Sequence, residues 1–171
     1  ITIGTSAGVR VVTDHPVIDP QQRLFCYAVD KGLWVIGGPL NNGGDVYQWA
    51  VEHLVDASAV KNENIDPYTL ANRVIEGVPA GAHGLLFHPF LGGERAPLWD
   101  ANARGSFFGL SHIHTRADML RSVMEGICMN IATVFQAVRD LVGNPASVTA
   151  TGGFARAEVW RQMLADVLNC P

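Results

Sequence analysis

Two turns near the start of the chain combine glycine with small polar residues and could bind an anion. The turn Gly4–Gly8 reads Gly-Thr-Ser-Ala-Gly and would let backbone N–H groups and the Thr5 hydroxyl approach an anion closely. The turn Asn41–Gly44 reads Asn-Asn-Gly-Gly and precedes an expected helix that carries Gln48. A helix N-terminus offers free N–H groups and a partial positive charge, which suits phosphate or ribose. Taken alone, each turn is better explained as a plain hairpin or an ordinary helix cap.

A third turn follows an expected strand at residues 148–151 and reads Gly152-Gly153 before a helix that begins near Ala157. Strand, double glycine and helix in this order would let a flat group such as adenine lie against bare backbone. Close packing of helix on sheet would explain the same glycines. Three such turns in one short chain favour a nucleotide site. The chain lacks the P-loop sequence and a usable dinucleotide-binding sequence, so neither of those sites is expected.

A longer pattern joins a glycine-bounded aromatic strand at residues 105–110 to the start of a helix at residues 116–142. The first part of the pattern consists of a small residue, an aromatic residue, a glycine and an aliphatic residue. After seven free positions, the second part consists of polar, apolar, small, aliphatic, apolar and acidic residues. This pattern resembles the C-terminal signature of the FGGY family of carbohydrate kinases. The matching positions are Gly105, Phe107, Gly109, Leu110, Asp118, Met119, Ser122, Val123, Met124 and Glu125.

The resemblance implies an α/β fold of the actin-like ATPase class, in which a ribonuclease H-like mixed sheet is flanked by helices. Two such domains enclose ATP in a cleft in that family, and residues 1–171 would form the C-terminal, nucleotide-binding domain. The implied activity is transfer of the γ-phosphoryl group of ATP to a carbohydrate hydroxyl, with Mg²⁺ as the metal. The implied partners are ATP, a sugar or sugar acid, and the N-terminal domain of the same protein.

The resemblance also assigns roles to the three glycine turns. Thr5 matches the threonine of a loop that meets the ATP phosphates. Gly44 and Gln48 match a glycine and a glutamine that line the nucleotide pocket. Gly152 and Gly153 match the adenosine loop. The expected ATP-binding residues are therefore Thr5, Gly44, Gln48, Gly152, Gly153 and Ala157, of which Ala157 stands where some relatives have asparagine and would contribute only backbone.

The catalytic base of the family is an aspartate that precedes the Gly-Thr turn, so it would lie before Ile1. We therefore assign no catalytic residue and no metal ligand to this chain, and we expect residues 1–171 alone to be inactive. The chain begins within a strand-like alternation and ends just past a helix, so we expect it to be truncated at both ends. His112, His114 and Asp118 stand near one another, but no further ligands flank them and a zinc site is not expected.

Two segments resemble the gluconate kinases of the family most closely, residues 38–44 and residues 93–100. D-Gluconate is therefore the expected acceptor, and xylulose or another sugar of the family is the alternative. An alternative of another class is a non-catalytic actin-like module that binds ATP for assembly or regulation. A third is an α/β interaction domain whose glycine turns are only structural. Glu94 and Arg95 are expected to form a salt bridge at the surface or between domains.

The elements that must position these residues can be predicted from apolar periodicity. Strands are predicted at residues 1–3, 9–13, 24–29, 33–37, 85–90, 106–110 and 148–151. Turns near Asp19 and Lys31 suggest that the strands at 9–13, 24–29 and 33–37 form an antiparallel meander. Strands interleaved with helices indicate an α/β layered domain.

Four helices are predicted between and after these strands. They cover residues 45–57, the segment from a cap at Asp66 to a stop at Gly77, residues 116–142, and residues 157–168. Thr115 and Asp118 have the spacing of a capping box ahead of the longest helix.

The composition narrows the class of protein. A chain of 171 residues with 48% hydrophobic and 16% charged residues is long enough for one domain with a sizeable core. Its net charge of −4 argues against nucleic acid or anionic membrane as a partner. Its three cysteines are odd in number and widely separated, which is typical of reduced thiols in a cytoplasmic protein. A homodimer is compatible with all of these features.

Overall fold

The computed structural model describes residues 1–170 and has two antiparallel sheets. The larger sheet contains β1 (Thr2–Ile3), β2 (Ala7–Thr13), β3 (Phe25–Asp30) and β4 (Leu33–Leu40), in the order β1-β2-β4-β3. The smaller sheet pairs β5 (Leu86–His88) with β6 (Ser106–Phe108). Around them lie α1 (Gly44–Leu54), α2 (Ala57–Glu63), α3 (Pro67–Glu76), α4 (Arg116–Val142) and α5 (Glu158–Leu168).

The expected meander of β2, β3 and β4 is wrong, because β4 lies between the other two strands. It pairs with β2 from Ala7↔Leu40 to Thr13↔Trp34, and β3 pairs with its other edge. A Cβ at position 37 would lie 2.1 Å from the Val9 carbonyl oxygen, so Gly37 is what permits the close approach of β2. The pairing of β2 with β4 therefore depends on a close backbone contact between residues far apart in the sequence, which the turn residues do not predict.

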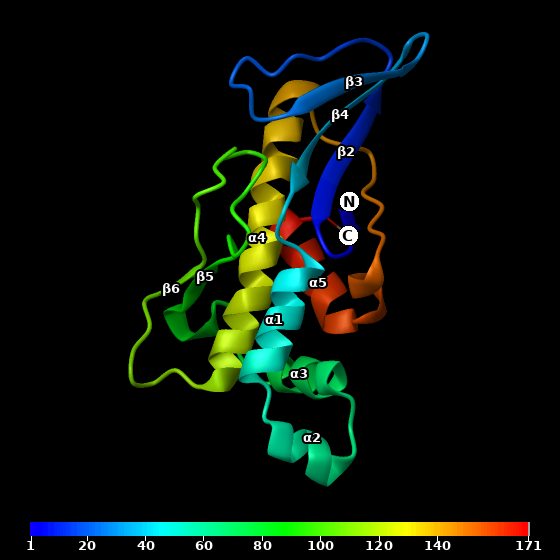
Figure 1. The fold of residues 1–171 in the computed structure, drawn as a ribbon. Coiled ribbons are helices and arrows are strands. Elements are labelled where there is room, and N and C mark those ends of the chain that lie inside the picture. Colours follow the sequence, from blue (N-terminus) through cyan, green and yellow to red (C-terminus); the bar gives the residue numbers. More distant parts are fainter. Residues whose placement is uncertain (171) are drawn as a thin grey trace.

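The helix α4 runs through the middle of the molecule and forms the centre of the core (Figure 1). Its bounds agree with the predicted helix, and the predicted capping box of Thr115 and Asp118 is present at its start. Buried apolar side chains from α4 pack against the larger sheet, β5, α1, α3 and α5. Figure 1 shows the larger sheet at one end of this helix and α2 and α3 at the other.

The helix predicted over residues 45–57 is present as α1 but ends three residues early, and the helix α2 that follows it was not predicted. The helix α1 ends at Leu54, and the side chain of Asp56 accepts hydrogen bonds from the N–H groups of Ser58 (2.8 Å) and Ala59 (3.4 Å). An aspartate in this position caps the N-terminus of a new helix, so α2 starts immediately afterwards. The helix predicted after Asp66 is confirmed as α3, with Asp66 as its N-cap and Pro67 at its first position.

The strand predicted at residues 148–151 is not present as a strand. Only Thr151 forms a bridge, parallel to Thr2, and its carbonyl oxygen accepts from the Ile3 N–H at 2.9 Å. The next residue, Gly152, has φ +117, and a Cβ there would lie 2.0 Å from the Ile3 carbonyl oxygen. The chain thus turns away as soon as it reaches the sheet, which limits the pairing to one bridge.

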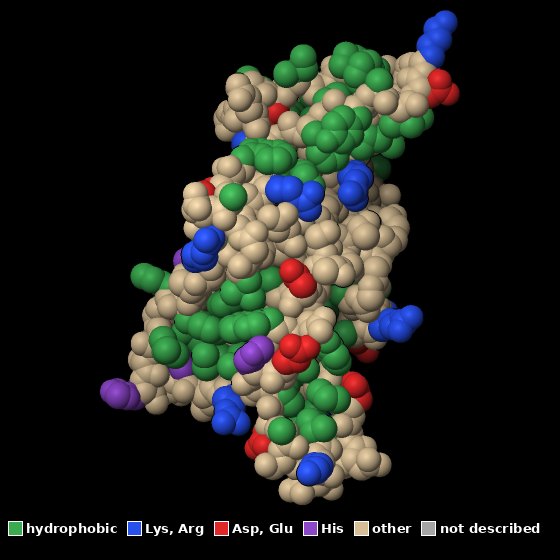
Figure 2. Space-filling view, viewed as in Figure 1, with side chains coloured by type: hydrophobic (Ala, Val, Ile, Leu, Met, Phe, Trp, Pro, Cys, Tyr) green, Lys and Arg blue, Asp and Glu red, His purple; other side chains and the backbone are tan. Residues whose placement is uncertain are grey.

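Exposed apolar side chains lie mainly over the β5–β6 sheet and over the end of the larger sheet near β3 (Figure 2). They include Leu86, Phe108, Leu110 and Ile113 in the first area and Tyr27, Val29 and Leu33 in the second. No helix within residues 1–170 combines the length and the apolar character that crossing a bilayer requires.

Replacing Gly152 tests the close approach of the third turn to β1. Gly152→Ala should lower the free energy of unfolding by at least about 2 kcal/mol, because it adds a backbone clash to an unfavourable φ. The control is Gly143→Ala, which shares a positive φ (+80) but has no atom within 4 Å of its Cβ. It should cost only about 1 kcal/mol. Urea unfolding measures both, and equal losses would contradict the clash.

Candidate functional site

A cavity of about 660 Å³ lies where the first turn, α1, α3 and the third turn meet. Of the six residues expected from the sequence, five line it: Thr5, Gly44, Gln48, Gly153 and Ala157. Gly152 does not line the cavity, and it acts instead through its contact with Ile3. Turns that are far apart in the sequence therefore converge on one hollow.

The first two turns are in direct backbone contact. The N–H of Gly44 donates to the Gly4 carbonyl oxygen at 2.7 Å, and the N–H of Asp45 donates to the Thr5 carbonyl oxygen at 3.1 Å. A Cβ on Gly44 would lie 2.6 Å from the Gly4 oxygen, and one on Gly43 would lie 2.7 Å from the Ser6 carbonyl carbon. Both glycines are therefore required for the two turns to meet.

These contacts correct the expectation that the start of α1 offers free N–H groups to an anion. The Asp45 carboxylate accepts from the N–H groups of Gly43 (2.9 Å) and Val46 (2.8 Å), and those of Gly44 and Asp45 are bonded to the first turn. The donors at this helix start are thus used within the protein. The second turn contributes shape to the cavity, while the exposed Thr5 side chain supplies a hydroxyl.

The third turn presents open backbone. It forms a short 3₁₀ helix, Gly153–Arg156, and Ala157 is the N-cap of α5. A Cβ on Gly153 would have no neighbour within 4 Å, so the cavity side of this turn is unobstructed. Next to it lies an aromatic group in which the Trp160 ring centroid is 4.7 Å from that of Tyr47 and 5.8 Å from that of Phe154. This part of the cavity can accept a flat apolar ligand group.

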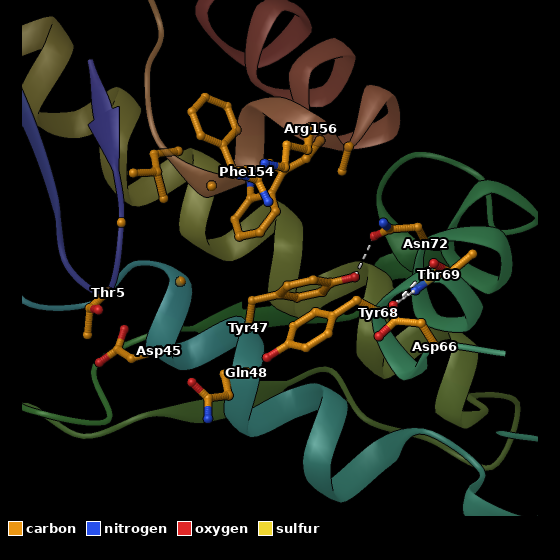
Figure 3. A pocket seen from close by; sticks show the side chains of 16 residues that line it. Thr5, Asp45, Tyr47, Gln48, Asp66, Tyr68, Thr69, Asn72, Phe154 and Arg156 are labelled. Carbon is orange, nitrogen blue, oxygen red and sulfur yellow. Dashed lines mark hydrogen bonds between the residues drawn. The ribbon is translucent and has the colours of Figure 1, made fainter. Parts of the chain in front are cut away.

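The α3 side of the cavity was missed at the sequence level. It contributes Asp66, Tyr68, Thr69 and Asn72, which Figure 3 shows opposite Thr5 and Asp45 with Tyr47 between the two ends. The Tyr47 hydroxyl donates to the Asn72 side-chain oxygen at 2.7 Å and joins α1 to α3. Burial raises the pKa of Tyr47 above its ordinary value, which keeps the hydroxyl protonated and able to donate.

The apolar spacing of residues 45–57 predicts a buried stripe of Val46, Trp49, Ala50, His53, Leu54 and Ala57, which leaves out Tyr47. The buried face of α1 consists instead of Val46, Tyr47, Ala50 and Val51. This face of α1 is buried because it contacts α3, and the sequence of α1 alone does not predict that contact. Asp66, predicted as a helix cap, is the one residue on the α3 side of the cavity that the sequence indicated.

Charged and amide groups at the cavity are few. Gln48 is exposed and its amide nitrogen donates to Glu52 at 2.7 Å, so its side-chain oxygen and its second amide N–H are left for a ligand. Among the lining residues Arg156 is cationic, and Asp45 and Asp66 are anionic. Asp66 already accepts from the Thr69 N–H (2.9 Å) as the cap of α3.

Glu94 and Arg95 do not form a salt bridge with each other within residues 1–170. Glu94 is buried, with 2% of its surface exposed, and its carboxylate accepts hydrogen bonds from neighbouring amide groups. The Arg95 guanidinium donates to the Leu40 carbonyl oxygen at 3.0 Å instead. The side chains point to different partners, because the loop before β6 is folded against β4 rather than free at the surface.

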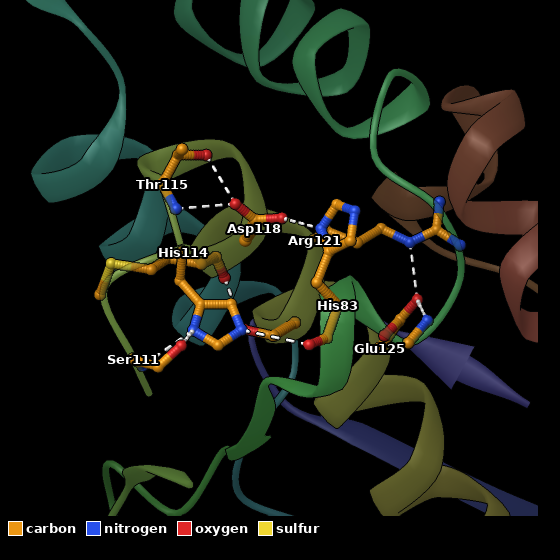
Figure 4. A network of polar contacts seen from close by, with 10 residues as sticks. His83, Ser111, His114, Thr115, Asp118, Arg121 and Glu125 are labelled. Atoms are coloured by element: carbon orange, nitrogen blue, oxygen red, sulfur yellow. Dashed lines mark hydrogen bonds and ion pairs between the residues drawn. The ribbon is translucent and has the colours of Figure 1, made fainter. Parts of the chain in front are cut away.

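A second polar cluster lies at the start of α4, away from the cavity (Figure 4). The Asp118 carboxylate accepts from the Thr115 N–H and hydroxyl, both at 2.7 Å, and His83 Nδ1 lies 2.7 Å from its other oxygen. His114 bonds to Ser111 rather than to Asp118. Within the part of the chain that the structure describes, no group of three or more potential ligand side chains could hold a metal.

Asp118 is the most strongly perturbed carboxylate of this cluster. Burial alone would raise its pKa, but the hydrogen bonds from Thr115 and His83 favour the ionised form and lower the pKa to about 2. The ionised carboxylate therefore fixes the segment that contains His83 to the first turn of α4.

Comparison with known proteins gives consistent matches over the whole chain. Residues 1–171 match the model of the FGGY family of carbohydrate kinases, C-terminal domain. Gluconokinase from Bacillus licheniformis is 48% identical over 172 residues, which cover 99% of this chain and 34% of that protein.

Solved structures match equally well. The crystal structure of gluconate kinase from Lactobacillus acidophilus has a TM-score of 0.88 at 42% identity, covering 99% of this chain and 33% of that chain. A ligand-bound xylulose kinase from the same organism has a TM-score of 0.89 at 41% identity, with the same coverage of 99% and 33%. These matches confirm the expected actin-like α/β fold and the position of residues 1–171 in the C-terminal domain. The chain spans about a third of the length of the curated relatives it matches.

The lowered pKa of Asp118 predicts a pH-dependent contribution to stability. The pKa is lower in the folded than in the unfolded chain, so the contribution is complete above about pH 4 and is lost as the pH falls toward 2. Asp118→Asn should therefore lower the free energy of unfolding by about 2 kcal/mol at pH 7, and by progressively less below pH 4. Urea unfolding across this range measures the difference, and a constant difference would contradict the assignment.

Proposed function

This chain belongs to the FGGY family of carbohydrate kinases, and we propose that it is the nucleotide-binding part of an enzyme that phosphorylates a sugar with ATP. The observation that carries this proposal is the convergence of three separate glycine turns on one cavity. If the three turns had separate and purely structural roles, they would not be expected to line the same cavity. The family supplies the reaction class, and the cavity supplies a place for ATP.

The arrangement of the cavity supports one orientation of ATP. The triphosphate would lie near Thr5 and Gly44, where the backbone of the first two turns is closest. The adenosine would lie against the open backbone of Gly153 and Ala157, beside the Tyr47 and Trp160 rings. Arg156 is cationic but belongs to the third turn, so it would lie on the adenosine side in this orientation.

Transfer of the γ-phosphoryl group requires a base for the sugar hydroxyl and stabilisation of the charge on the phosphoryl oxygens. This chain would contribute to binding and orientation through its turns. Mg²⁺ would accompany ATP and neutralise phosphate charge when bound. We propose that the base and the rest of the cleft come from an N-terminal domain of the same protein.

D-Gluconate is the proposed acceptor, with xylulose as the alternative. The gluconokinase match at 48% identity favours gluconate. The gluconate kinase and xylulose kinase structures are nearly equal in similarity, with TM-scores of 0.88 and 0.89, which is why xylulose stays the alternative. A cytoplasmic location follows from the use of ATP as co-substrate, and a second copy of the chain is a candidate partner for the exposed side chains near β3.

The substrate proposal predicts a kinetic preference in the complete enzyme. Its kcat/KM for D-gluconate should exceed that for D-xylulose by at least about 100-fold, because discrimination between a carboxylate and a carbonyl substrate rests on buried polar contacts. A coupled assay of ADP release with each sugar measures the ratio. A higher value for xylulose would replace gluconate by the alternative, and no ATP-dependent turnover with any sugar would refute the kinase proposal.

The adenosine assignment predicts a selective effect of filling the third turn. Gly153→Arg should raise the KM for ATP by at least about tenfold and leave the KM for the sugar within about twofold, because the new side chain would project into open cavity. Thermal unfolding of the variant provides the control for folding. An unchanged KM for ATP in a folded variant would remove Gly153 from the adenosine site.

A further inference from the structure

The loop before β6 contains a buried carboxylate that has no role in the cavity so far. Glu94 is 2% exposed, and it forms no salt bridge within residues 1–170. It does not line the cavity, so a direct contact with the nucleotide is not its function. A buried carboxylate without a cation is costly unless hydrogen bonds compensate the lost hydration.

Four hydrogen bonds provide that compensation. One oxygen of Glu94 accepts from the backbone N–H groups of Asn41 (2.6 Å) and Arg95 (2.8 Å). The other accepts from the side-chain amides of Asn42 (3.0 Å) and Asn130 (2.6 Å). Hydrogen bonds to an ionised acceptor are stronger than neutral ones, so this carboxylate fixes all of its donors firmly.

The donors come from three places in the sequence. Arg95 belongs to the loop itself, Asn130 to the middle of α4, and Asn41 and Asn42 to the turn between β4 and α1. The Asn42 side chain is also tied to the same loop, since it donates to the Gly93 carbonyl oxygen at 2.6 Å and accepts from the Gly92 N–H at 3.2 Å. Glu94 thus connects the second glycine turn to the central helix.

The second glycine turn is connected to the cavity through its contact with the first glycine turn. Asn42 is followed directly by Gly43 and Gly44, whose backbone touches the first turn at Ser6 and Gly4. A shift of the second turn would therefore displace the Thr5 side of the cavity as well. We propose that Glu94 is a positioning residue for the nucleotide, which it serves by holding the Asn41–Gly44 turn against α4. This inference rests on the proposed binding of ATP in the cavity.

The test is Glu94→Gln in the complete enzyme. One oxygen would become an amide donor facing the donors of Asn42 and Asn130, so the turn should loosen. The KM for ATP should rise by about tenfold, and the dissociation constant of a fluorescent ATP analogue should rise in parallel. The KM for the sugar should rise by less than the KM for ATP, because the Asn41–Gly44 turn contacts the cavity proposed for the nucleotide.

The matched control is Glu125→Gln, which makes the same change at another buried carboxylate. Glu125 is 5% exposed on α4 and bonds to Arg121 and to the Gly81 N–H, away from the cavity. It should lower the thermal unfolding midpoint and leave the KM for ATP within about twofold. Equal effects of both variants on the KM for ATP would show a general loss of stability and would overturn the proposal.

A rescue variant separates positioning from stability. In the double variant Glu94→Gln, Asn130→Asp, a carboxylate on α4 can accept from the new amide, so at least half of the lost ATP affinity should return. The milder single variant Asn130→Ala keeps the Glu94 charge and removes one donor, and it should raise the KM for ATP by about threefold. Unaltered ATP kinetics in Glu94→Gln would refute the positioning role, whereas failure of the unaltered enzyme to use ATP would refute the proposed function instead.

Discussion

The site depends on one backbone contact, the hydrogen bond from the Gly44 N–H to the Gly4 carbonyl oxygen (2.7 Å). A Cβ at position 44 would come within 2.6 Å of that oxygen, so the contact exists only because glycine occupies the position. The same contact consumes a donor at the start of α1. The cavity therefore offers a ligand the shape of its backbone, the Thr5 hydroxyl and the open face of Gly153. The partial positive charge at the N-terminus of α1 contributes less.

Polar groups in the cavity wall and behind it fix the positions of the elements that form the cavity. The Tyr47 hydroxyl joins α1 to α3 through Asn72, and the Glu94 carboxylate joins the second turn to α4. Both groups form hydrogen bonds to other groups of the protein. Directional hydrogen bonds therefore position the elements around the cavity, in addition to apolar packing. The long helix α4 serves as the common support, because the sheet, α1 and α5 all pack against it.

The features that could be predicted from sequence are those with local causes. The bounds of α4, its capping box and the cap of α3 are encoded within a few residues of the helix ends concerned. The glycine turns could be identified from the sequence, and the family resemblance led to the proposal that they share a role in nucleotide binding. Strand order and the buried state of Glu94 depend on residues distant in the sequence, such as Gly37 facing Val9 and Asn130 facing the loop. Periodicity carries no information on such contacts, so they became visible only in the structure.

A crystal structure of the complete protein with a non-hydrolysable ATP analogue would test the proposed site most directly. The account predicts the triphosphate within hydrogen-bonding distance of Thr5, and the adenine against the backbone of Gly153 beside Tyr47. A nucleotide bound elsewhere, with the cavity between the three turns left empty, would contradict it.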